Sequence, residues 1–243
     1  MKEIIALKQL TKGLFLKNGE IDYKKLQNNL TQNSIFTFLV NIEYIFYAPD
    51  NLYIGYDYFP GGELYFHLSK EKRFSESRIK FYSAQIIYAL IFLHAKCIIY
   101  RNLYPENILI NSDGYIGLSD YGFLNENPIT EEFLMNISTP EYVAPEMIKC
   151  EKLTKAVDWW MLGILLYEMA VGIPPFFHPV ITTLYRFICN ETQIYPDPHK
   201  FNIQISNPLK DLIDKLLQKD PSKRLGNINE NEVYNHLDRK SVV

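Results

Sequence analysis

The sequence predicts an α+β protein made of two unequal lobes, a small β-rich lobe followed by a larger helical one. Short apolar runs of strand length dominate before residue 60, whereas apolar residues at helical spacing dominate after it. The change falls at the glycine-rich stretch Pro60-Gly61-Gly62, which marks a joint. We therefore expect residues 1–59 and 60–243 to form the two lobes of one domain.

The first lobe is predicted to hold strands around one helix. Residues 3–9 form a short apolar run, and residues 23–34 are polar with helical spacing. The runs 38–46 and 52–58 flank the turn residues 48–51, among which proline, aspartate and asparagine favour a chain reversal. These patterns predict a helix between the first strand and a hairpin.

The second lobe alternates helices with one short β segment. Residues 63–68 and 75–96 carry apolar residues at helical spacing, and Ser75 is a suitable helix start. Residues 98–121 return to strand-like runs around a turn at residues 112–114. From Asp158 onward the chain is predicted to be mostly helical.

Composition excludes several classes of function. The 243 residues include 25 Lys+Arg and 28 Asp+Glu, and the net charge of -3 offers no basic surface for nucleic acid. Cys97, Cys150 and Cys189 lack the paired spacing of a zinc site or a disulfide framework, which favours a reduced, cytoplasmic location. The most apolar stretch, residues 159–171, is too short to span a bilayer, so no membrane span is expected.

Short motifs follow one another in a fixed order along the second lobe. They are Tyr100-Arg101-Asn102-Leu103-Tyr104-Pro105-Glu106-Asn107, Ser119-Asp120-Tyr121-Gly122, Thr139-Pro140-Glu141-Tyr142-Val143-Ala144-Pro145-Glu146, Asp158-Trp159-Trp160 and Asp220-Pro221-Ser222-Lys223-Arg224-Leu225-Gly226. Together they resemble the signature set of eukaryotic protein kinases. Tyr-Arg in place of His-Arg, residues 61–68 and the 158–160 run are similar to the AGC group of serine/threonine kinases.

The resemblance covers residues 4 to about 238 and implies a bilobal kinase-like fold with ATP and Mg²⁺ as cofactors and a protein as substrate or partner. Lys8 would meet the α- and β-phosphates, while Asn107 and Asp120 would hold Mg²⁺ through oxygen atoms. The remaining cofactor-binding positions lie at the hinge and the adenine slot: Ala6, Asp57, Phe59, Glu63 and Leu109.

Each of these assignments has a plainer alternative. Lys8 also fits a solvated strand lysine, and Asp120 fits a turn-forming aspartate before a glycine. The apolar residues of the adenine slot fit ordinary core packing equally well. Bulky Tyr56 falls at the gate at the back of the implied pocket, and the tyrosine at position 121 keeps the aromatic body of the usual phenylalanine.

The catalytic positions depart from the family pattern. Asn102 stands where active relatives carry the aspartate that accepts the proton, and a carboxamide is not a base near neutral pH. Tyr104 stands where a lysine would steady the transferred phosphoryl group. The leading interpretation is a pseudokinase that acts as a binding or scaffold module. The alternative is an active ATP-dependent serine/threonine kinase, in which Glu63 and Glu106 favour basic residues near the acceptor.

Further departures concern the phosphate clamp and the switch. The glutamate that would position Lys8 falls on Gln27 or Gln32, with Glu20 as a more distant candidate. Only seven residues precede Lys8, so the glycine-rich loop is missing, and a fragment or a truncated gene prediction is a third interpretation. The usual phosphorylatable threonine of the activation segment is Met135 here.

The structural positions are better kept than the chemical ones. Glu146 and Arg224 are expected to form a buried ion pair that ties the activation segment to the large lobe. Asp158 is expected to cap the backbone of the catalytic loop from a core helix.

Overall fold

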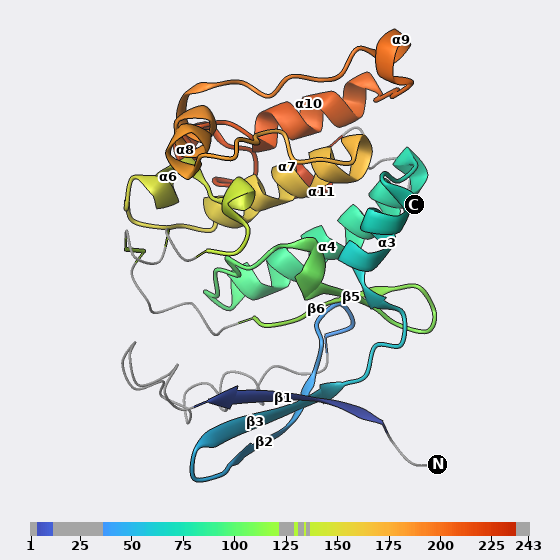
Figure 1. The fold of residues 1–243 in the computed structure, drawn as a ribbon, viewed down its shortest axis with the longest axis vertical. Coiled ribbons are helices and arrows are strands. Elements are labelled where there is room, and N and C mark those ends of the chain that lie inside the picture. The colour runs from blue at the N-terminus through green and yellow to red at the C-terminus, as the bar shows by residue number, and fades with distance from the viewer. Residues whose placement is uncertain (1–3, 12–35, 122–128, 131–133, 135–136, 237–243) are drawn as a thin grey trace.

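The computed structural model describes residues 4–11, 36–121, 129–130, 134 and 137–236. A small antiparallel sheet lies at one end of the molecule and a stack of helices at the other (Figure 1). This arrangement confirms the predicted α+β class with a small β-rich part and a larger helical part.

The strands are β1 (Ile5–Thr11), β2 (Ile42–Tyr47), β3 (Asn51–Asp57), β4 (Gly62–Glu63), β5 (Ile108–Ile110) and β6 (Ile116–Leu118). The α-helices are α3 (Leu64–Glu71), α4 (Glu76–Ala95), α6 (Pro145–Ile148), α7 (Ala156–Val171), α8 (Ile181–Asn190), α9 (Pro198–Phe201), α10 (Asn207–Leu216) and α11 (Asn231–Tyr234). Short 3-10 turns cover Pro105–Asn107, Pro140–Tyr142 and Pro221–Lys223. The predicted long helix after Ser75 is confirmed, and the serine hydroxyl accepts a hydrogen bond from the Arg78 N–H.

The first sheet has the order β1-β3-β2 with antiparallel pairing throughout. Its hairpin closes at the predicted turn, where the Ala48 N–H donates to the Asn51 carbonyl at 2.9 Å. In the register of β1 and β3, Ala6 lies opposite Tyr56 and Lys8 lies opposite Ile54. The predicted helix at 23–34 with Gln27 and Gln32 lies outside the described residues, as do the more distant candidate Glu20 and Met135.

The predicted strand 38–46 is wrong in its first half. β2 begins only at Ile42, and the residues before it pair with the second sheet instead. The Leu118 N–H donates to the Phe38 carbonyl at 2.9 Å, and the Val40 N–H donates to the Leu118 carbonyl at 3.0 Å. One apolar run is therefore divided between two sheets, because Leu39 and Val40 are buried where the sheets meet.

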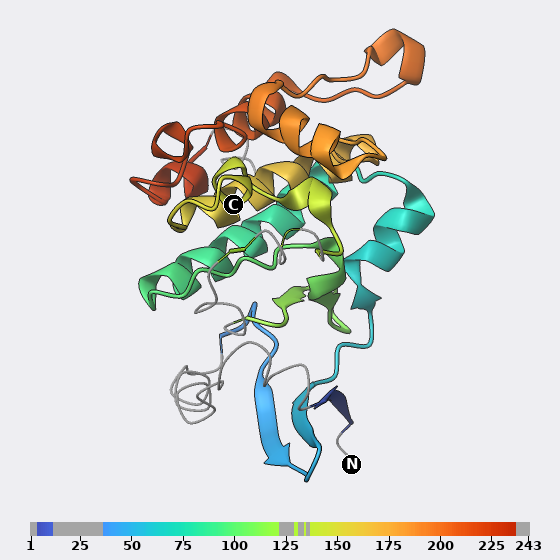
Figure 2. The ribbon, with the colours of Figure 1, turned by 60° about the vertical axis from the view of Figure 1, so that its left-hand side comes forward.

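The linker between the two parts runs from β3 to β4, and Figure 2 shows it as a single stretch of chain between the first sheet and the helical part. The Gly61 N–H donates to the Ile110 carbonyl at 2.9 Å, which docks the linker on β5. A Cβ atom at Gly61 would lie 2.7 Å from that carbonyl oxygen, so only glycine fits here. The glycine-rich stretch noted in the sequence is thus the point where the chain passes closely over the second sheet.

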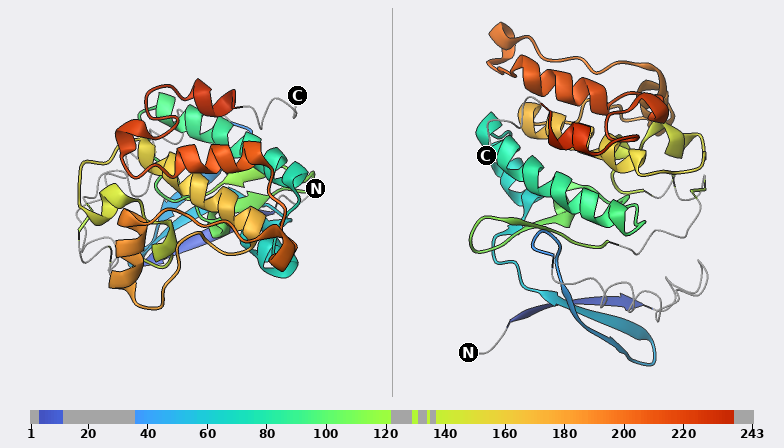
Figure 3. Two further views of the ribbon diagram at one scale, coloured as in Figure 1. Left: turned by 90° about the horizontal axis from the view of Figure 1, so that it is seen from above. Right: turned by 180° about the vertical axis from the view of Figure 1, so that it is seen from behind.

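Helix α7 is the core of the helical part and packs between α4 and α10 (Figure 3). Trp159 and Trp160 at its start are completely buried. The helix ends at Gly172, whose φ of 96° gives the left-handed cap that glycine adopts without strain. Within the part of the chain that the structure describes, no helix has both the length and the apolarity needed to cross a membrane.

The predicted ion pair between Glu146 and Arg224 is confirmed. Two guanidinium nitrogens donate to the two carboxylate oxygens at 2.5 and 2.9 Å, and both side chains are almost fully buried. The same guanidinium also donates to the carbonyls of Ala156 and Gln218. One arginine therefore joins the end of the activation segment, the start of α7 and the loop after α10.

Replacing Glu146 by glutamine should strongly destabilise the protein, because the Arg224 charge would remain buried without its partner. Breaking a buried pair in this way typically costs about 3–5 kcal/mol. The matched control is Glu71→Gln, which removes the exposed Arg78–Glu71 pair (N···O 2.7 Å) and should cost less than about 1 kcal/mol. Urea unfolding measures both free energies, and equal losses in the two variants would contradict the expectation.

Candidate functional site

The backbone of the loop at residues 100–107 is held by the buried carboxylate of Asp158 on α7. Its two oxygens accept hydrogen bonds from the Tyr100 N–H at 2.8 Å and the Arg101 N–H at 2.7 Å. Arg101 has a φ of 58°, a left-handed conformation that a non-glycine residue adopts only under constraint. The predicted cap by Asp158 is confirmed, and it supplies this constraint.

Asn102 and Asn107 lie at the two ends of a tight turn in this loop. The Asn107 side-chain nitrogen donates to the Asn102 carbonyl at 2.9 Å. Because the amide nitrogen faces the Asn102 carbonyl, the side-chain oxygen of Asn107 points away from that carbonyl. The Asn107 carbonyl in turn accepts the Ser119 N–H at 2.9 Å, which brings Asn107 beside the residue that precedes Asp120.

Lys8 and Asp120 meet although 112 positions separate them in the sequence. The Lys8 ammonium nitrogen lies 2.5 Å from a carboxylate oxygen of Asp120, and the side chains are 40% and 22% exposed. Asp120 has a φ of 54°, again in the left-handed region. Asn107 and Asp120 offer an amide oxygen and a carboxylate, which are ligand types that Mg²⁺ prefers, so the residues present fit this cation.

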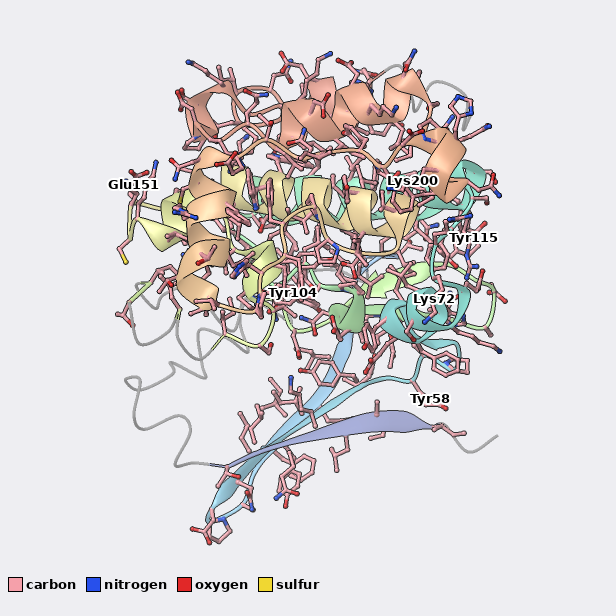
Figure 4. All side chains as sticks on the ribbon, turned by 45° about the horizontal axis from the view of Figure 1, so that its top comes forward. Tyr58, Lys72, Tyr104, Tyr115, Glu151 and Lys200 are labelled. Carbon is pink, nitrogen blue, oxygen red and sulfur yellow. The ribbon has the colours of Figure 1, made fainter. Side chains whose placement is uncertain are left out.

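Tyr104 lies inside the helical part, toward the side that faces the first sheet (Figure 4). Its side chain is only 8% exposed, and its ring packs edge-on against Tyr142 with the centroids 5.3 Å apart. Burial raises the pKa of the Tyr104 hydroxyl to about 12. The position where a positive charge would be expected is therefore occupied by a neutral, buried phenol.

Three of the residues predicted for the hinge and the adenine slot pack against one apolar cluster. Ala6, Phe59 and Leu109 all pack against the apolar cluster of the first sheet. Glu63 lies opposite Leu109 in the pairing of β4 with β5 and is exposed. The Asp57 N–H donates to the Asn41 carbonyl at 3.1 Å, and its carboxylate accepts from the Asn41 side chain at 2.8 Å.

Gly117 on β6 makes room for Phe59, which the sequence pattern does not indicate. A Cβ atom at this glycine would lie 2.6 Å from the Phe59 ring, so the ring packs directly on the strand backbone. The signal in the sequence is weak, because a single glycine in a short strand has many explanations. The structure thus places the Phe59 ring directly against β6.

Two tyrosine hydroxyls near Asp120 were also missed. Tyr100 donates to the Ser119 carbonyl at 2.7 Å, and Tyr121 donates to the Val40 carbonyl at 2.9 Å. Tyr56 lies close by, and the pKa of its hydroxyl is raised by burial and further by the Asp120 charge. Three tyrosine side chains, those of Tyr56, Tyr100 and Tyr121, therefore lie near Asp120.

His94 on α4 forms a buried bridge that the sequence did not reveal. Its ring nitrogens lie 2.7 Å from Asp158 and 2.5 Å from Glu230, and its side chain is only 2% exposed. Burial lowers the pKa of the imidazole, but the hydrogen bonds to the two carboxylates outweigh burial and raise it to about 8. Lys155 also contacts Glu230 at 3.3 Å. The charged imidazole thereby supports the aspartate that holds the catalytic loop.

Comparison with known proteins identifies the class. Residues 1–237 match the family described as Protein kinase domain, so the chain belongs to the protein kinase family. Its relatives place it in the AGC group of serine/threonine kinases, as the motifs predicted.

Three relatives illustrate this similarity. The RAC family serine/threonine-protein kinase homolog of Dictyostelium discoideum is 39% identical over 229 residues, which cover 93% of this chain and 50% of that protein. Serine/threonine-protein kinase sgk-1 of Caenorhabditis elegans is 42% identical over 234 residues, covering 94% of this chain and 49% of the relative. Serine/threonine-protein kinase YPK1 of Saccharomyces cerevisiae is 36% identical over 239 residues, covering 97% and 34%. The chain thus spans about half the length, or less, of these relatives.

The His94 bridge predicts a loss of stability at alkaline pH. The folded-state pKa of about 8 lies above the usual 6.5, so the stabilisation is complete below pH 6.5 and is lost as the pH rises through 8. The expected loss is about 2 kcal/mol. Unfolding free energies between pH 6 and 9 should show it in the wild type and not in His94→Gln. Parallel pH profiles of the two proteins would contradict the bridge.

Proposed function

We propose that this chain is an AGC-type kinase domain with strongly impaired phosphoryl transfer, which acts as a binding or scaffold module and keeps a nucleotide site. The observation that carries the proposal is the pair Asn102 and Tyr104 in an otherwise ordered catalytic loop. Asp158 holds the loop backbone in place, so the loss concerns the reacting groups and not their frame.

Phosphoryl transfer needs a group that accepts the proton of the attacking hydroxyl. The carboxamide of Asn102 cannot accept this proton near neutral pH, and a positioned base is typically worth about 10²–10⁴-fold in rate. The phenol of Tyr104 cannot supply the positive charge that would steady the transferred group, because it is neutral when protonated and negative when ionised. Both replacements lower turnover, and their effects need not add.

The residues for nucleotide binding are better kept. Bound Mg-ATP would supply the phosphoryl group and the charge-neutralising cation. Lys8 would donate to the phosphates, and Asn107 with Asp120 would offer oxygen atoms to Mg²⁺. The contact of Lys8 with Asp120 supports this assignment, because it places the cation-binding carboxylate beside the phosphate-binding ammonium.

The rest of the nucleotide site follows from the division into lobes. We assign residues 1–59 to the small lobe and residues 60–243 to the large one, with the nucleotide between them. Asp57 and Phe59 would offer hinge backbone to the adenine, Ala6 and Leu109 would cover its faces, and Glu63 would lie at the ribose end. The shared packing of Ala6, Phe59 and Leu109 supports this arrangement.

An active serine/threonine kinase is the second candidate, and the acidic side chains near the catalytic loop favour it. Glu168 is partly buried and accepts a hydrogen bond from the Tyr142 hydroxyl. Burial raises the pKa of Glu168, and the nearby charges of Glu106 and Glu141 raise it further. Such a cluster suits a substrate with basic residues near the acceptor, and Glu63 lies exposed at the end of the linker.

Restoring the missing groups should restore activity. We expect Asn102→Asp, alone or with Tyr104→Lys, to raise the rate of phosphate transfer from radiolabelled ATP to a basic serine peptide by at least about 100-fold. The control adds Lys8→Ala to the restored protein and should abolish the gain. Brisk transfer by the wild-type protein that Lys8→Ala abolishes would instead establish the second candidate.

Nucleotide binding should depend on magnesium through Asp120. Calorimetric titration with ADP should give a lower Kd in the presence of Mg²⁺ than in EDTA for the wild-type protein. Asp120→Asn should remove most of this difference, because the carboxylate charge that attracts the cation is lost. Glu71→Gln, which removes only the exposed ion pair with Arg78, serves as the control that leaves the difference unchanged. The absence of any heat with the wild type would remove the nucleotide site from the proposal.

A further inference from the structure

The ring of Tyr121 is fixed by a hydrogen bond that a phenylalanine cannot make. Its side chain is 6% exposed, and its hydroxyl donates to the Val40 carbonyl at 2.9 Å. The family motif has phenylalanine at this position, and the sequence alone suggested a mild exchange that keeps the aromatic body. The structure shows instead that the exchange adds a polar contact across 81 positions of sequence.

Val40 is a firm anchor for this contact. Its side chain is 1% exposed and belongs to the apolar cluster of the first sheet with Leu52 and Ile54. Its N–H donates to the Leu118 carbonyl at 3.0 Å, so its backbone is also tied to β6. The Tyr121 hydroxyl therefore links the residue after Asp120 to the short segment that joins both sheets.

Asp120 is held on its other side as well. The carbonyl of Ser119 accepts the Tyr100 hydroxyl at 2.7 Å, so the residues before and after Asp120 are each tied to a fixed element. Asp120 itself has a φ of 54°, which is disfavoured for a residue with a side chain and persists only where the surroundings impose it. In this conformation its carboxylate reaches Lys8.

We propose that Tyr121 is a positioning residue whose hydroxyl latches its ring against Val40 and thereby keeps the Asp120 carboxylate turned toward Lys8. Outward rotation of the ring must break this bond and leave the Val40 carbonyl without its donor, which adds a cost that phenylalanine would not impose. The contact would orient the Asp120 carboxylate before the cation binds. Its use therefore rests on the proposed nucleotide site.

A merely structural hydroxyl would stabilise the whole domain without favouring the local conformation of residues 118–121. The two roles differ in what the isosteric Tyr121→Phe variant changes. A latch makes local opening of this segment easier while the rest of the core stays closed. A structural hydroxyl lowers the global free energy of unfolding and leaves local opening in the folded state unchanged.

The test is amide hydrogen exchange of the ligand-free protein, followed in peptides that cover residues 111–121. We expect Tyr121→Phe to accelerate exchange in this segment about fivefold, the effect of losing one hydrogen bond. The matched control is Tyr167→Phe, which removes a tyrosine hydroxyl that donates to the Ile194 carbonyl at 2.6 Å, far along the chain from the site. It should leave exchange at 111–121 unchanged.

A second arm adds Mg²⁺ and ADP. Mg-ADP binding that requires the Asp120 carboxylate to face Lys8 should restore slow exchange in Tyr121→Phe, since the ligand selects this conformation. Faster exchange without ligand, together with no response to Mg-ADP, would support the latch and contradict the nucleotide site. Unchanged exchange at 111–121 in Tyr121→Phe, or the same acceleration in Tyr167→Phe, would overturn the latch.

Discussion

The backbone of the catalytic loop depends on one interaction, the set of hydrogen bonds to the buried carboxylate of Asp158. It is completely buried on α7, and it receives two backbone N–H groups from the catalytic loop and a ring nitrogen of His94. A buried carboxylate without such partners would be strongly unfavourable, so the loop, the helix and the imidazole fix one another. The left-handed backbone at Arg101 is one visible consequence. Glu230 extends the same network to the C-terminal segment.

This frame and the reacting groups have separate physical requirements. The frame needs buried hydrogen bonds and ion pairs with close geometry, and the pairs of Asp158 with the loop and of Glu146 with Arg224 provide them. Phosphoryl transfer needs a base and a positive charge beside the transferred group. Near neutral pH the Asn102 carboxamide is not a base, and the Tyr104 phenol carries no positive charge. The hydrogen bonds and ion pairs of the frame do not depend on the residue types at 102 and 104, because they are made by the Asp158 carboxylate with loop N–H groups and by Glu146 with Arg224.

Much of the fold was predictable because the signals are local. The helix after Ser75, the hairpin turn at residues 48–51 and the short strands before Asp120 all appear where the periodicity places them. The strand predicted at 38–46 failed for a non-local reason, since Phe38 and Val40 pair with Leu118 across the sheets. Apolar periodicity reports burial and does not say which neighbour causes it.

The sequence by itself determined the class of fold, the order of the motifs and the identity of the groups at Asn102 and Tyr104, because these depend on residue type and spacing. Only the tertiary structure decided how Tyr121 meets Val40 and how His94 joins two carboxylates. Such contacts link residues far apart in the chain through one hydroxyl or one imidazole. Their geometry depends on how the packed elements bring the groups within about 3 Å, and no local pattern encodes that distance.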